Sequence, residues 1–329
     1  MAKKENNKSS FKMQGIVFFK IKDDTQAKEV EPYFYEKVDQ EDKIKLATDF
    51  RPYRSHFQYS IFIDNQSSAP VTEMKIKIKF PEFLTFSKYY PQSITCSGIK
   101  TEKNIKQINF EINELIEKTN QQIYLHFTVN TLDNVGEIRT IVTYVNNRNT
   151  IRVLDSRPSE IAINGTIIEP KVVPSSFIRE FAQQKGIKKA IKGIGIGIKH
   201  QIDPEMFFEI LEQLFYRRNF QLVSKDLDKK ILWYFGTESM IKEDVLVIGQ
   251  IISNKIEIIA SSPNHYLIIS LLIQISNDLN NYLFSNGIIN SKDDIYDLEC
   301  KNCGAILPYF PPKRKPIECK NCKYEQMIW

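Results

Sequence analysis

The chain has 329 residues, of which 42% are hydrophobic and 26% are charged, and this composition excludes a chain that is disordered throughout. Its length corresponds to two or three domains, and its net charge of +5 is too small to require a nucleic acid as partner. The polar first residues and the lack of an apolar run of roughly 20 residues predict neither a secretion signal nor a membrane span. We therefore expect a protein of the reducing cytoplasm.

The N-terminal half predicts an all-β domain. Residues 1–10 are expected to form a disordered tail, and residues 11–170 an immunoglobulin-like β-sandwich. A strand-like run at 14–22 precedes a mixed, charged stretch at 23–50, which predicts an irregular connection. From residue 57 onward, apolar and polar residues alternate as in half-buried strands. The predicted strands lie at 58–64, 74–80, 107–112, 122–130, 138–145, 150–154 and 161–168.

Two features of these strands have an ordinary interpretation. Lys75, Lys77 and Lys79 alternate with apolar residues along one strand, which is typical of a solvated face that protects an exposed sheet edge. His126 falls on the outer face of its strand, so we expect a surface histidine there.

The stretch from Glu169-Pro170 to Pro174 is interpreted as a domain boundary, and the hydrophobic period changes after it. Ser175 predicts the start of a short helix, while Asp203 and Ser262, each followed at once by proline, predict the starts of longer ones. The longer helices are expected at 204–216 and 265–284, and the strands at 186–199, 220–223, 230–235, 245–252 and 256–260. The order β-α-β-β-β-β-α predicts a platform over 175–287, in which helices cover an antiparallel sheet.

The glycine-rich stretch 186–199 permits three interpretations. As a phosphate loop it lacks the Gly-Lys-Ser/Thr ending. As a basic membrane-surface helix it has suitable lysines, but each internal glycine would cost about 1 kcal/mol. A strand is favoured because Ile194, Ile196 and Ile198 alternate with glycine. The glycines would then let a bulky group lie close across that face.

Four of the five cysteines lie in the last thirty residues, as Cys300-x-x-Cys303 and Cys319-x-x-Cys322. This paired spacing is typical of a four-thiolate zinc site, and four thiolates close the coordination shell, so the ion would be structural. Two disulfides could use the same cysteines, but nothing in the sequence indicates export. We therefore predict one zinc ion in a small zinc ribbon at 300–329, joined by an acidic linker at 288–299.

Short stretches between about residues 50 and 285 match the pattern of one known family. In the platform they are Asp244-Val245-Leu246-Val247, the strand at 256–260, Ser261-Ser262, and the run from Pro204-Glu205-Met206 to Ser224-Lys225-Asp226. In the sandwich they are Phe57-Gln58-Tyr59 and Asp64-Asn65-Gln66. In these stretches the sequence resembles the appendage, or ear, domain of the coatomer gamma subunit and, more distantly, of the clathrin adaptor large subunits.

This resemblance implies a module that binds short peptide motifs of partner proteins, such as trafficking or small-GTPase machinery. The coatomer form has a Phe-x-x-x-Trp element at the start of its platform. The matching residues here are Phe177 and Phe181, so phenylalanine stands where that family has tryptophan. The long helical trunk of coat subunits has no counterpart in this sequence, and the cysteine-rich tail is not part of the family pattern.

We predict a peptide-binding groove near Phe177, Phe181 and Trp233. Nearby lysines would attract an acidic-aromatic motif, and they are Lys185, Lys188, Lys189 and Lys192. The sequence has neither a His-Glu-x-x-His nor a Gly-x-Ser-x-Gly motif, so we expect no enzymatic activity.

Two other partners remain possible from the sequence. The predicted ribbon is basic and carries Tyr309, Phe310, Tyr324 and Trp329, whose rings could stack on bases of a nucleic acid. The lysine-rich stretch 185–199 could instead make peripheral contact with an anionic membrane.

Overall fold

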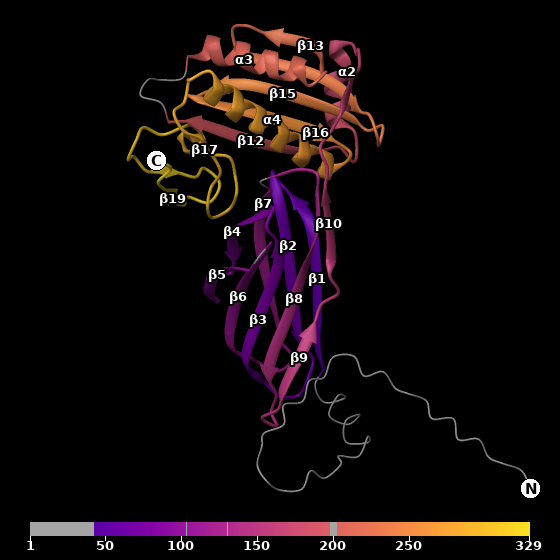
Figure 1. Cartoon of the computed structure of the whole chain (residues 1–329), viewed down its shortest axis with the longest axis vertical. Coiled ribbons are helices and arrows are strands. Elements are labelled where there is room, and N and C mark those ends of the chain that lie inside the picture. Colours follow the sequence, from indigo (N-terminus) through magenta and orange to yellow (C-terminus); the bar gives the residue numbers. More distant parts are fainter. Residues whose placement is uncertain (1–42, 103, 130, 198–202) are drawn as a thin grey trace, which may run out of the picture.

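The computed structural model describes residues 43–102, 104–129, 131–197 and 203–329 (Figure 1). The predicted tail at 1–10, the strand at 14–22 and Ile198 lie outside these residues. Three parts are visible: a long β-sandwich, a second sheet with helices at one end of it, and a small C-terminal ribbon beside both (Figure 1).

The sandwich consists of two antiparallel sheets. The four-stranded sheet has the order β1 (Ile44–Tyr53), β2 (His56–Asn65), β7 (Asn120–Val129) and β4 (Leu84–Tyr90). The six-stranded sheet has the order β10 (Ser159–Ile163), β8 (Asn134–Val145), β3 (Val71–Pro81), β6 (Ile105–Leu115) and β5 (Thr95–Glu102), and β9 (Ile151–Asp155) also pairs with β8. Alternating apolar residues from both sheets form one core between them, as the period of two predicts.

The sequence prediction missed strands β1, β4 and β5. The charged residues Lys45, Asp49 and Arg51 made the first of these look irregular, yet they alternate with inward-facing positions of β1.

The interpretation of the lysine row was also wrong in one respect. Strand β3 carries that row and lies between β8 and β6, so the lysines do not protect a sheet edge.

The second part is built on a seven-stranded antiparallel sheet. Its order is β11 (Ile168–Pro170), β14 (Ile231–Glu238), β15 (Asp244–Ile252), β16 (Lys255–Ser262), β12 (Lys188–Ile196) and β17 (Ile295–Asp297), and β13 (Gln221–Asp226) pairs with β14. Residues 188–196 therefore form a strand, as the isoleucine–glycine alternation predicts. The segment predicted as a linker, 288–299, is not only a linker, because it contains a short helix η1 (Lys292–Asp294) and the edge strand β17.

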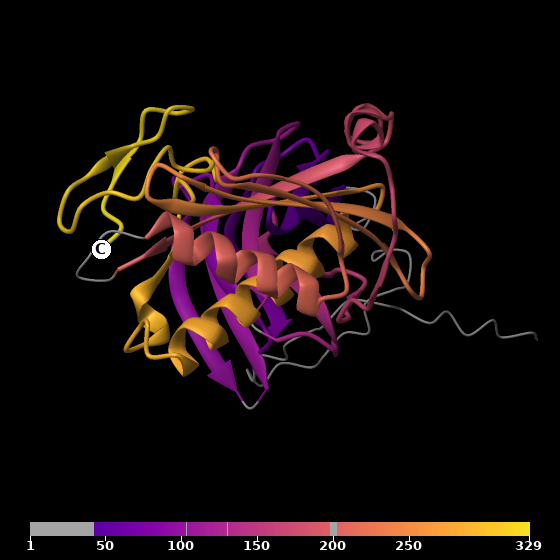
Figure 2. The same ribbon diagram turned by 90° about the horizontal axis from the view of Figure 1, so that it is seen from above.

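Helices cover both faces of this sheet (Figure 2). Helices α3 (Pro204–Arg217) and α4 (His265–Ser285) lie on the inner face, whereas α2 (Ser175–Gln183) packs on the outer face through Phe181, Phe235 and Leu246. Two of these helices have an N-cap residue that differs from the predicted one. Pro174 occupies the N-cap of α2 without a side-chain bond, and the N-cap of α4 is Asn264, whose Oδ1 accepts hydrogen bonds from two backbone amides.

Helix α4 joins the sheet to the sandwich. One side of it packs on the sheet through residues such as Leu271 and Ile275, while Ile269 on another side is fully buried in the sandwich core. A helix that is apolar on more than one side must be buried on more than one side. Among the described residues, no helix is both long enough and apolar enough to span a bilayer.

Candidate metal centre and the ribbon interface

The four paired cysteines converge at the ribbon. Their sulfur atoms all lie within 4.8 Å of one another, and none of the cysteines is in a disulfide. The Sγ atoms of Cys300 and Cys322 are 3.5 Å apart, and those of Cys303 and Cys319 are 3.6 Å apart. Four sulfurs around one zinc ion, each about 2.3 Å from the metal, would be about 3.8 Å apart. The cluster therefore has the size and donor set of a four-thiolate metal site.

The two halves of the cluster share one local fold. After the second cysteine of each pair the chain turns through a left-handed residue, Gly304 with φ +70° and Lys323 with φ +61°. These turns bring a later amide back to the first cysteine: Gly304 donates to the Cys300 carbonyl at 2.7 Å, and Lys323 to the Cys319 carbonyl at 2.9 Å. Donors also reach the sulfurs, since the Cys303 amide lies 3.5 Å from the Cys300 Sγ and Asn321 Nδ2 lies 3.4 Å from the Cys303 Sγ.

The ribbon lies against the outer face of β12, where the sequence places glycines. A Cβ atom on Gly195 would lie 2.3 Å from Cδ2 of Phe310, and one on Gly197 would lie 2.7 Å from the ring of Tyr296. The Phe310 ring stacks on Trp329 at 5.0 Å between centroids. The expectation that the glycines admit a bulky group is confirmed, and that group is the aromatic face of the ribbon.

Hydrogen bonds fix the ribbon to the sheet. Strand β17 extends the sheet next to β12, and the Leu298 amide donates to the Gly193 carbonyl at 2.8 Å. Lys255 is 4% exposed, and its Nζ donates to the Leu307 carbonyl at 2.6 Å. A buried ammonium group needs such acceptors, so this contact is specific to the docked ribbon.

The other side of the ribbon contacts the sandwich. Arg54 donates from Nη1 to the Cys303 carbonyl, and Lys88 Nζ donates to the Cys300 carbonyl at 3.2 Å. Ser55 donates to the carboxylate of Glu299, the residue that precedes the first cysteine. The same turn also reaches the sheet domain, because His265 Nε2 at the start of α4 bonds the Arg54 carbonyl at 2.9 Å. One turn of the sandwich therefore contacts both the backbone of the metal site and helix α4.

Two buried histidines lie beneath this contact. His56 and His126 are 4% and 8% exposed, and His56 Nε2 lies 2.8 Å from His126 Nδ1. The expectation of a surface histidine at 126 was wrong, because the neighbouring strands and side chains cover the outer face there. Burial, reinforced by repulsion from His56, lowers the pKa of His126 to about 3. His56 Nδ1 faces the Glu299 carboxylate at 3.7 Å, and this neighbour lowers the pKa of Glu299 although burial alone would raise it.

The residues predicted for peptide binding do not all share one surface. Phe181 is 3% exposed because its ring meets Phe235 edge-on at 5.1 Å, so it anchors α2 and presents no ring to a ligand. Phe177 is half-buried beside it. Lys192 points to the inner face and pairs with Asp297 at 2.8 Å, so it does not border a groove on the outer face. The three lysines that remain exposed are Lys185, Lys188 and Lys189.

Trp233 belongs to a row of apolar residues across the outer face. Cross-strand partners place Trp233 beside Ile248, Ile248 beside Ile259, and Ile259 beside Ile191. Three of the four are partly exposed, and Ile259 is 8% exposed. We call these four residues the apolar row. It crosses four strands, with α2 packed toward one side and the ribbon toward the other.

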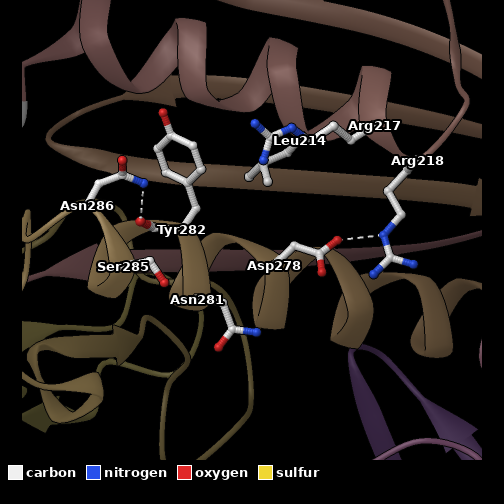
Figure 3. Close-up of a pocket in the computed structure, with 8 residues that line it drawn as sticks. All are labelled: Leu214, Arg217, Arg218, Asp278, Asn281, Tyr282, Ser285 and Asn286. Atoms are coloured by element: carbon white, nitrogen blue, oxygen red, sulfur yellow. Dashed lines mark hydrogen bonds and ion pairs between the residues drawn. The ribbon is translucent and has the colours of Figure 1, made fainter.

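An open depression of about 650 Å³ lies between α3 and α4 (Figure 3). Its two arginines are already engaged by neighbouring side chains. Arg218 pairs with Asp278 at 2.5 Å, and the guanidinium of Arg217 lies 5.7 Å from the centre of the Tyr282 ring. This depression therefore has the character of a contact between two helices.

Sequence reasoning missed the sandwich side of the interface. Arg54, Ser55, His56 and Lys88 carry no local motif, and they gain their role only from the ribbon, more than 200 residues away in the chain. The only available signal was the acidic Glu299 directly before Cys300.

No protein-family model matches the chain, and no curated protein matches it. Solved structures that match include a non-cellulosomal cohesin from Archaeoglobus fulgidus, at 15% identity over 33% of this chain and 83% of that chain, with a TM-score of 0.24. The pilin subunit BcpA of Bacillus cereus has 9% identity over 63% and 59%, with a TM-score of 0.31. Spo0M of Bacillus subtilis has 8% identity over 67% and 79%, with a TM-score of 0.20. None of the three is a coat or adaptor subunit, and likeness at this level identifies neither a shared fold nor a shared function.

Proposed function

We propose that this protein is a non-enzymatic interaction module that binds a short peptide of a partner protein on the outer face of its seven-stranded sheet. The observation that carries this proposal is the apolar row, which is partly exposed and crosses strands in register. Partly exposed apolar surface bordered by other elements is typical of an interaction site.

The charges beside the row indicate the kind of peptide. Lys185, Lys188 and Lys189 are exposed at the turn from α2 into β12, and Lys189 pairs with Ser261 next to the row. Exposed cations accelerate the encounter with an acidic segment, while buried aromatic contacts supply most of the affinity. The peptide would therefore combine acidic residues with an aromatic side chain. The appendage resemblance of the sequence supports partners from membrane-traffic machinery.

We further propose that one zinc ion occupies the four-cysteine site. Four thiolates without a carboxylate or an open position favour a structural zinc site over a catalytic one. The metal would keep the ribbon folded, and the folded ribbon would fix the sheet to the sandwich through the contacts described above.

Binding of a nucleic acid by the aromatic residues of the ribbon has less support. Of the four aromatic residues considered for base stacking, Phe310 and Trp329 pack on the glycines of β12, and only Tyr309 and Tyr324 are exposed.

Replacing Trp233 with serine should weaken peptide binding at least tenfold. Peptides would first be selected from a random display library on the immobilised full-length protein, and the affinity of the best one would be measured by fluorescence polarisation. A truncated aromatic at the centre of a binding surface commonly costs 2 kcal/mol or more, which is roughly thirtyfold. Tyr216→Ser is the matched control, because Tyr216 is 76% exposed on α3 at the inner face. Equal binding by the Trp233 and Tyr216 variants would contradict the proposed site.

A further inference from the structure

A second cavity lies where the ribbon meets the sandwich. Its volume is about 390 Å³, within the range of small-molecule sites. The apolar part of its wall comes from Tyr296 on β17 and from Met327 and Ile328 near the C-terminus. Lys88 on β4 and Lys301 in the first cysteine turn supply cationic groups to the same wall. Three separate parts of the fold thus contribute to one cavity.

The two acidic groups in the wall already have partners within the protein. Asp297 pairs with Lys192 at 2.8 Å. Glu299 accepts a hydrogen bond from Ser55 and faces His56 Nδ1 at 3.7 Å.

The ammonium groups of the two lysines have only carbonyl acceptors within hydrogen-bond distance, although Glu299 and the cluster sulfurs attract Lys88 from farther away. Lys88 donates to a backbone carbonyl at 3.2 Å, and Lys301 donates to the Met327 carbonyl at 3.4 Å. Neither forms an ion pair within 4.0 Å of its ammonium among the residues that the structure describes. Arg54 adds a further positive charge close to Lys88, because Nη1 of Arg54 and Nζ of Lys88 both lie next to Gly304. A half-buried ammonium beside apolar surface is stabilised when an anion joins it.

We propose that this cavity binds a carboxylate carried on an apolar body. The carboxylate accepts hydrogen bonds from Lys88, with Lys301 as the second cation, and the apolar body lies against Met327, Ile328 and Tyr296. Two sources present this chemistry: a free organic acid, and the C-terminal carboxylate of a peptide with an apolar last residue. This cavity is separate from the apolar row. The outcome of its test therefore does not depend on whether Trp233 binds a peptide.

Binding there has a structural consequence. A ligand that contacts β4, β17 and the C-terminal end of the ribbon favours the arrangement in which all three are together. It would therefore stabilise the docked ribbon as well as occupy the cavity.

The test uses the full-length protein, with its zinc content measured, and two matched pairs of probes. The first pair is 4-phenylbutyrate and its uncharged amide, and the second is the peptide acetyl-Gly-Gly-Phe with a free or an amidated C-terminus. Binding is followed by NMR through the methyl group of labelled Met327 and by the thermal unfolding temperature. We expect each acid to shift the Met327 signal and raise the unfolding temperature, and each amide to bind at least tenfold more weakly.

Variants identify the cation. Lys88→Met should reduce the affinity for the acids at least tenfold, whereas Lys320→Met, an exposed lysine of the second cysteine turn, should leave it unchanged. The Met327 titration of the unaltered protein keeps the test decisive if Lys88→Met fails to fold. A stronger response to the small acid assigns the site to free organic acids, and a stronger response to the peptide acid assigns it to chain termini. Equal binding of acid and amide, no response to either acid at millimolar concentration, or undiminished binding by a folded Lys88→Met protein would overturn the proposal.

Discussion

Replacing Cys319 with serine should abolish stoichiometric zinc binding and lower the free energy of unfolding by at least about 3 kcal/mol, because the binding energy of a structural zinc is folding energy. The ribbon has few apolar groups of its own. Its small core contains Leu298 from the preceding segment and five buried residues of the ribbon, which are Cys300, Leu307, Phe310, Ile317 and Cys319. A core of this size does not hold a segment of about thirty residues folded without a metal or another cross-link. Loss of the ion would therefore release the ribbon from β12 and from the sandwich.

The measurements for this variant are metal content by mass spectrometry and unfolding in urea. Cys96→Ser is the matched control, because Cys96 is a half-buried free cysteine of the sandwich outside the cluster. The control should keep one zinc per chain and lose less than about 1 kcal/mol, as expected for a substitution away from the metal site. A Cys319→Ser protein with the stability of the control would show that the ribbon needs no metal.

Replacing Gly195 with alanine should destabilise the protein by about 1–3 kcal/mol, the usual range for overpacking. The new Cβ would lie 2.3 Å from Cδ2 of Phe310, closer than atoms in proteins approach. The ring has little freedom to withdraw, because it stacks on Trp329 at 5.0 Å and on Tyr296 at 5.9 Å. The ribbon would therefore have to move away from β12.

A double-mutant cycle separates this clash from a general effect on the strand. In a Phe310→Ala background the space above Gly195 is open, so the same Gly195→Ala change should cost less than about 0.5 kcal/mol. Unfolding in urea of the four proteins gives the coupling energy. Equal costs in both backgrounds would mean that the ribbon does not lie on Gly195 in solution.

Local patterns predicted the parts of the fold that local physics determines. The paired cysteine spacing identified the ligands of the candidate metal site, and the alternation of isoleucine with glycine identified both β12 and the close contact across it. Helix α3 begins at Pro204 as its capping signal predicts, and Asp203 accepts a hydrogen bond from the Glu205 amide at 3.0 Å.

Features that depend on contacts between distant segments could not be predicted in this way. His126 alternates correctly for the outer face, but its burial depends on neighbours such as Tyr53, His56 and Lys88 from other strands. The burial of Phe181 likewise depends on Phe235, which is more than fifty residues away. Strand β17 was hidden because three residues carry almost no periodicity.

Hydrogen exchange with and without a zinc chelator tests most directly the central claim, that a metal-held ribbon fixes the seven-stranded sheet to the sandwich. We predict that chelation accelerates exchange in residues 300–329 and also outside them, at the amides of Gly197 and Leu298, which bond the carbonyls of Asp294 and Gly193, and in the sandwich turn around Arg54. Helix α3 should keep its protection, because its core lies on the other face of the sheet. Faster exchange confined to residues 300–329, with no change at the amides of Gly197 and Leu298 or in the turn at Arg54, would contradict the claim.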